Sequence, residues 1–158
     1  MKTVMTKAGT AKKDPRMPGM PWMTACMIAR DLEKSIEFYK KAFGFEEKFV
    51  MRGPDGKPQH AELKYEDALI MLGPEGFPGC STKSPASSKV DNGMGLYLYC
   101  DDVDAFYLRA IKAGAEVLAV PQDAFWGDRT VRLRDIDGYN WHFATNVREF
   151  DPSKVPQK

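Results

Sequence analysis

The chain has 158 residues, 43% of them hydrophobic and 28% charged, which is typical of a globular protein with one sizeable core. Its 23 basic and 22 acidic residues give a net charge of +1, so no overall field favours nucleic acid, acidic lipid or a strongly charged substrate. No stretch predicts a membrane helix or a secretory signal. Three cysteines without metal-site spacing indicate free thiols, and we expect a cytoplasmic protein.

The first folded unit is expected at residues 21–75, after a flexible basic arm at 1–20 whose sequence has no helical or strand periodicity. An apolar run at Met23–Ile28 predicts a strand. A helix follows, with Asp31 as its N-cap and Gly44 as its left-handed stop. Three shorter strands are predicted next, at Glu46–Met51, Gln59–Tyr65 and Ala68–Leu72.

Residues 76–92 are rich in Gly, Pro and Ser and predict an unstructured linker to a second unit at 93–147. This unit opens with a strand at Met94–Cys100 and a helix that begins after Asp101 or Asp102 and ends at Gly114. A tail at 148–158 completes the chain. The remaining strands of the second unit are predicted at Ala115–Val120, Thr130–Arg134 and Tyr139–Thr145.

The two units repeat each other at a constant offset of 70 residues. Internal repetition of this kind constrains the whole architecture. The order of elements in each unit predicts an α+β fold of two tandem βαβββ units. Without any gap, the offset superimposes Asp31 on Asp101, Gly44 on Gly114 and Asp67 on Asp137.

Three segments, DLEKSIEFYKKAFGF, FWGDRTVRLRDIDG and NWHFAT, resemble the vicinal oxygen chelate superfamily of glyoxalases, bleomycin-resistance proteins and dioxygenases. The similarity covers roughly residues 21–145. HAELKYEDALIMLG is typical of the bleomycin-resistance-like branch. The resemblance implies that the two units form a curved mixed-sheet cup, that a ligand lies on its concave face, and that the protein is a homodimer.

The resemblance also allows a test for metal ligands, which the metal-using members carry on the first and last strands of each unit. The corresponding residues are Thr24, Met71 or Leu72, Gly95 and His142. One imidazole in such a set is a poor metal site, so we expect no metal and no other cofactor. If a metal is bound, the candidate ligands are His60, Glu62 and His142.

The candidate ligand-binding residues are two histidines, one carboxylate, three aromatic residues and one arginine: His60, Glu62, Tyr97, Tyr99, Trp126, Arg129 and His142. Each has a structural alternative. His60 and Glu62 also fit a solvated sheet face, and His142 also fits a partly buried histidine that is hydrogen-bonded to a backbone carbonyl. Tyr97 and Tyr99 suit core packing, Trp126 suits the core or a dimer contact, and Asp128–Arg129 suits a local ion pair.

Two functions are favoured by these features, and a structural or regulatory partner protein is a third alternative. The first is a homodimer that binds a small hydrophobic or aromatic molecule without metal, with antibiotic sequestration as a specific form. The alternative is a metal-dependent glyoxalase-type lyase, isomerase or dioxygenase with atypical ligands. The sequence identifies no catalytic residue and leaves open whether the protein is an enzyme. Neither nucleic acid nor a membrane is an expected partner.

Overall fold

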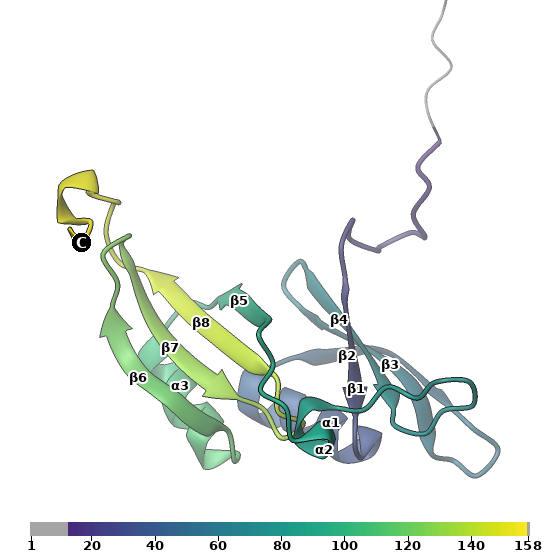
Figure 1. Cartoon of the computed structure of the whole chain (residues 1–158). Helices are drawn as coiled ribbons and strands as arrows, with labels where there is room; N and C mark the ends of the chain where they lie inside the picture. The colour runs from purple at the N-terminus through teal and green to yellow at the C-terminus, as the bar shows by residue number, and fades with distance from the viewer. Residues whose placement is uncertain (1–12, 158) are drawn as a thin grey trace, which may run out of the picture.

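The computed structural model describes residues 13–157, so the first twelve residues of the predicted arm lie outside the described range. Each unit contains one strand, one helix and three further strands in chain order (Figure 1), which confirms the two tandem βαβββ units. No helix within residues 13–157 is long and apolar enough to cross a membrane. The first unit comprises β1 (Ala25–Ala29), α1 (Leu32–Phe38), the π-helical turn η1 (Tyr39–Phe43), β2 (Glu46–Arg52), β3 (Pro58–Tyr65) and β4 (Ala68–Pro74).

The second unit and the flanking segments repeat this plan with two short additions, α2 before the unit and η2 after it. These elements are α2 (Pro85–Ser88), β5 (Gly95–Tyr99), α3 (Val103–Lys112), β6 (Glu116–Asp123), β7 (Asp128–Arg134), β8 (Asn140–Asn146) and the 3-10 turn η2 (Pro152–Lys154). The helical turn α2 lies inside the predicted linker 76–92. It docks on the second unit, because the Ala86 amide donates to the Asp137 carbonyl at 2.9 Å.

Each unit forms one four-stranded mixed sheet. Sheet A has the order β1-β4-β3-β2, and sheet B has the equivalent order β5-β8-β7-β6. The first strand of each unit pairs in parallel with the last, and the other pairs are antiparallel. Parallel pairing is possible because a helix and two strands separate the paired strands along the chain.

The helices confirm the predicted caps and show why the repeat is not perfectly regular. The Asp31 side chain accepts from the Lys34 amide at 3.2 Å. In the second unit Asp102, not Asp101, caps α3. The distance from cap to glycine is therefore 44 − 31 = 13 residues in the first unit and 114 − 102 = 12 in the second. The extra residue is absorbed by η1, where the Gly44 amide donates to a carbonyl five residues earlier.

One hydrophobic core is shared by both units. The Phe43 ring lies 5.9 Å from Phe106 and 4.7 Å from Phe143, and Trp141 lies 5.9 Å from Phe45 (centroid distances). All five side chains are buried. Because strand side chains alternate, each sheet packs one face on this core, and no helix within residues 13–157 covers the other face. We call the second face of each sheet its open face.

Two buried carboxylates in the turn between β7 and β8 connect this turn to the helix of the first unit. Asp135 accepts from the Tyr39 hydroxyl at 2.5 Å and from Trp141 Nε1 at 2.9 Å. Asp137 accepts from Ser35 Oγ at 2.5 Å. Hydrogen bonds to charged groups typically contribute about 1.5–3 kcal/mol each, so these contacts fix the units relative to each other.

Candidate functional site

The open face of sheet B gathers aromatic side chains around one carboxylate. Tyr97 and Tyr99 come from β5, Asp128 is the first residue of β7, and Asn146 is the last residue of β8. Trp126 precedes β7 in the loop. We call these five residues the Asp128 cluster.

Asp128 is the centre of this cluster. Its Oδ2 accepts from the Tyr97 hydroxyl at 2.7 Å, the Tyr99 hydroxyl at 2.9 Å and Trp126 Nε1 at 3.1 Å. Its Oδ1 accepts from Asn146 Nδ2 at 2.9 Å. The carboxylate is 2% exposed, so each of these donors replaces a water that burial removes.

The hydrogen bonds decide the charge state of the cluster. Burial opposes ionisation of Asp128, but the donors, Asn146 and the two tyrosines foremost, outweigh burial and lower the pKa of its carboxyl below the usual value. Burial and the hydrogen bond to Asp128 raise the pKa of Tyr97 to about 12. The cluster therefore holds a carboxylate and two neutral phenols near neutral pH.

The turn before β7 positions Trp126. Gly127 has φ +106°, and a β-carbon there would lie 2.3 Å from the Arg148 carbonyl oxygen. Only glycine permits both this backbone conformation and this approach. The amides of Val147 and Arg148 donate to the Gly127 carbonyl at 3.0 and 3.1 Å. The chain after β8 therefore holds the turn that carries the indole.

The aromatic rings of the cluster remain accessible although their polar atoms are satisfied. Tyr97 is 44% exposed, Tyr99 57% and Trp126 42%. Ala144, which is in register with Tyr99, is fully buried. The result is a partly exposed apolar surface with fixed ring positions, which suits contact with a planar or hydrophobic molecule.

His142 lies beside the cluster on the same face. Its imidazole stacks on Tyr97 with a centroid distance of 5.8 Å and an interplanar angle of 22°. Burial, and then the charge of Arg132, lower the pKa of His142 below 6.5, so the ring is neutral at pH 7. The neighbouring residues Trp141 and Phe143 point to the opposite face, into the core.

His60 and Glu62 lie on the other sheet. They share the open face of sheet A, where His60 Nε2 is 3.7 Å from Glu62 Oε1. Glu62 also pairs with Lys48 Nζ at 2.7 Å, and this hydrogen bond is the main reason that its pKa is lowered. The exposed side chains of Phe49 and Met51 flank the pair on β2.

Arg129 points away from the Asp128 cluster. Its guanidinium pairs with Asp104 at 2.7 Å and with Asp123 at 3.0 Å. The suggested Asp128–Arg129 ion pair is therefore wrong. Neighbouring side chains on a strand point to opposite faces, so Asp128 faces the tyrosines while Arg129 faces the helix side.

Asp128 and Asn146 were missed in the sequence analysis. The available signal was the alternation along β7, which places Asp128 on the same face as Thr130 and Arg132. A buried carboxylate on that face needs hydrogen-bond donors, and Tyr97 and Tyr99 supply them. The predicted ion pair between Asp128 and Arg129 assigned the carboxylate to the wrong partner.

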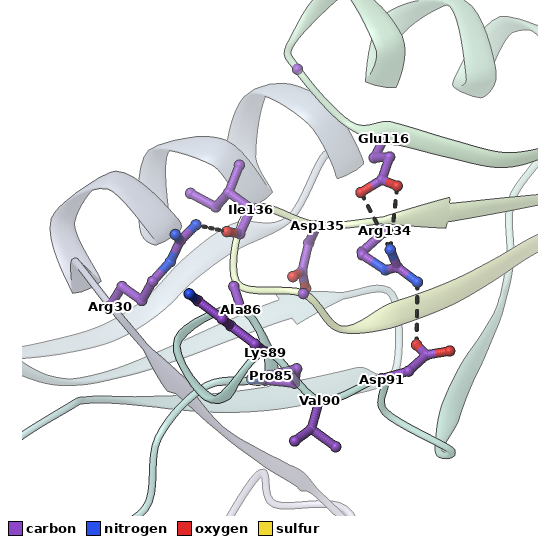
Figure 2. A pocket seen from close by; sticks show the side chains of 12 residues that line it. Arg30, Pro85, Ala86, Lys89, Val90, Asp91, Glu116, Arg134, Asp135 and Ile136 are labelled. Atoms are coloured by element: carbon purple, nitrogen blue, oxygen red, sulfur yellow. Dashed lines mark hydrogen bonds and ion pairs between the residues drawn. The ribbon is translucent and has the colours of Figure 1, made fainter.

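A separate polar hollow of about 670 Å³ lies where α2 meets the turn between β7 and β8 (Figure 2). Its lining includes Arg30, Lys89 and Arg134, with the carboxylates of Asp91 and Glu116 paired to Arg134 at 3.2 Å. Three cations and three anions line the hollow, and Arg134, Asp91 and Glu116 pair with each other. This balance gives the hollow no clear preference for a ligand charge.

Comparison with known proteins agrees with this architecture. Residues 22–143 match the sequence model of the Glyoxalase/Bleomycin resistance protein/Dioxygenase superfamily. The chain belongs to this superfamily. An uncharacterised protein of Mycobacterium bovis is 32% identical over 136 residues, which cover 85% of this chain and 90% of the relative. The superfamily assignment confirms the resemblance inferred from the sequence.

Solved structures of the superfamily fold are also similar to this chain. TioX from Micromonospora sp. ML1 superposes with a TM-score of 0.64 at 24% identity, covering 79% of this chain and 98% of TioX. TnmS3 from Streptomyces sp. CB03234, an antibiotic binding protein, gives 0.57 at 23% identity, with coverages of 82% and 98%. At these identities the likeness shows the fold alone.

The positions that correspond to metal ligands in the superfamily offer few donors in this chain. Met71 faces the open side and lies 3.8 Å from Cys26 (Sδ to Sγ), while Leu72 is buried in the core. A β-carbon at Gly95 would come within 3.2 Å of His142 Nε2. Among residues 13–157, no group of three or more His, Cys, Asp or Glu side chains is placed to hold a metal ion. The donor set of one chain therefore does not fit a metal.

Proposed function

We propose that the protein binds a small planar aromatic or hydrophobic molecule on the open face of sheet B. The observation that carries this proposal is the set of three partly exposed aromatic rings whose polar atoms converge on buried Asp128. Rings that are already fixed lose little conformational freedom on binding, and a preorganised apolar surface gains affinity for that reason. The similarity to TnmS3 supports sequestration of an antibiotic as a specific form of this function.

The protein is proposed to act as a homodimer in which a second copy covers the open face of sheet A and leaves the site on sheet B accessible. Sheet A exposes large apolar side chains on its open face, including Phe49 at 52% and Met51 at 41%. Contiguous exposed apolar groups are typical of interaction surfaces. Sedimentation velocity should give about twice the chain mass of 17.8 kDa. A monomer at micromolar concentration would contradict this arrangement.

The competing function is a metal-dependent lyase, isomerase or dioxygenase that uses His60, Glu62 and His142. These residues lie on two different sheets, and Glu62 is already paired with Lys48. Elemental analysis after incubation with nickel, zinc, manganese or iron(II) separates the two functions. We expect no stoichiometric metal. Metal retained by the wild-type protein and lost in His142→Ala would establish the alternative.

The proposed setting is a reducing cytoplasm. Cys26, Cys80 and Cys100 are free thiols, which supports this setting.

The binding site is tested with N-phenyl-1-naphthylamine, an uncharged aromatic probe whose fluorescence rises in apolar surroundings. We expect saturable binding to the wild-type protein, weakened about tenfold by Trp126→Ala because one ring contact and its buried area are lost. Trp22→Ala is the matched control, because Trp22 is 75% exposed and stacks with Arg16 in the segment before β1. Equal affinity of wild-type protein and Trp126→Ala would refute the proposed site.

A further inference from the structure

Three arginines on β7 differ in how they are neutralised. Arg129 pairs with Asp104 and Asp123, and Arg134 pairs with Glu116 and Asp91. Arg132, between them, is exposed and forms no ion pair or side-chain hydrogen bond within residues 13–157. An uncompensated guanidinium on the face proposed to bind a ligand is available for an acidic group.

Arg132 lies in one row with two residues of the candidate site. It is in register with His142 on β8, which is in register with Tyr97 on β5. The imidazole of His142 extends over Gly95, whose missing side chain leaves room for it. No side-chain hydrogen bond within the described residues occupies the ring nitrogens of His142, so a neutral hydrogen-bonding group stands between the guanidinium and the aromatic rings.

The carboxylate of Asp128 does not oppose an acidic ligand strongly. It is 2% exposed and its two oxygens accept four hydrogen bonds, which compensate its charge locally. Arg132 is exposed to solvent on the same face. Within the row formed by Arg132, His142 and Tyr97, the exposed charge is therefore positive.

We propose that the ligand of this site is an aromatic molecule with an acidic group, held by its ring against Tyr97 and Trp126 and by its acidic group at Arg132 and His142. This inference rests on the proposed function and adds the ligand's chemical class. The superfamily assignment does not specify this charge preference, because it depends on which arginine of β7 is left without a carboxylate.

The test compares two probes that share the same ring system. N-Phenyl-1-naphthylamine is uncharged, and 1-anilinonaphthalene-8-sulfonate adds one sulfonate. We expect the wild-type protein to bind the sulfonate about three- to tenfold more tightly, and we expect the difference to shrink with added salt. Arg132→Gln should remove the preference, because it weakens binding of the sulfonate more than binding of the uncharged probe. Arg132→Lys, which keeps the charge, should retain part of it.

Arg129→Gln is the matched control, because it removes a guanidinium from the same strand on the opposite face and should keep the preference. Far-UV circular dichroism and the denaturation midpoint establish that each variant is folded. Equal affinities of the wild-type protein for both probes, or a preference that survives in Arg132→Gln, would overturn this inference while leaving the proposed function intact. Failure of both probes to bind would instead overturn the proposed function.

Discussion

Replacing Asp128 with asparagine should destabilise the protein although the side-chain shape is preserved. Three donors to Oδ2 change from charge-assisted to neutral hydrogen bonds, and each change costs about 1 kcal/mol. The new amide also meets the Asn146 amide unless one of them rotates. Because the tyrosine rings are partly exposed, we expect a net loss of about 2 kcal/mol in the free energy of unfolding, measured with urea at pH 7.

The pH dependence of Asp128→Asn provides a second readout. The folded pKa of Asp128 lies below the ordinary value of 3.8, so its ionised form stabilises the fold above that pH. This contribution is lost as the pH falls below 3.8 toward the folded value. The stability gap between wild-type protein and Asp128→Asn should therefore shrink between pH 7 and pH 3. Asp67→Asn, in an exposed turn, is the control. A gap below about 0.5 kcal/mol at pH 7 would refute this account of the cluster.

Three further predictions concern residues on the open face of sheet B. In an NMR titration His142 should have a midpoint below 6.5, and Arg132→Gln should raise it; a wild-type midpoint at or above 6.5 would contradict the described burial. Spectrophotometric titration should find the Tyr97 phenol at about 12, moving toward 10 in Asp128→Asn; an unmoved value would show that Asp128 is not its partner. Gly95→Ala should shift the His142 ring resonances, because its β-carbon would lie 3.2 Å from Nε2; unchanged resonances would place the ring elsewhere.

The sequence predicted the fold well because each unit carries its own local signals. Asp31, Gly44 and Gly114 mark the helix ends, and the apolar periodicity between them is strong. The N-cap of the second helix is Asp102, one residue after the position that the constant offset predicts. A π-helical turn leaves no clear mark in hydrophobic periodicity, so the extra residue in the first helix became visible only through its hydrogen bonds.

The site was predicted in part. Tyr97, Tyr99 and Trp126 were identified by residue type, and the structure brings them together. Their common partner Asp128 was not identified, because the register between β5 and β7 depends on the strand β8 that lies between them. Long-range register of this kind is set by the whole sheet and cannot be found from the spacing of one segment.

The buried carboxylates of the turn between β7 and β8 show a similar limit. The sequence aligned Asp137 with Asp67 as equivalent turn residues, yet Asp137 is buried against Ser35 while Asp67 is exposed. The two units are equivalent in backbone but not in surroundings, because the turn of the second unit hydrogen-bonds to Ser35 and Tyr39 of the first unit. Repetition therefore predicts elements more reliably than it predicts the roles of their side chains.

The most direct test of the central claim is a crystal structure of the protein with bound N-phenyl-1-naphthylamine. The account predicts that the naphthyl ring contacts Tyr97, Tyr99 and Trp126 within about 4 Å, on the open face of sheet B. A probe bound instead in the hollow beside Arg30 and Lys89, or on sheet A, would contradict it.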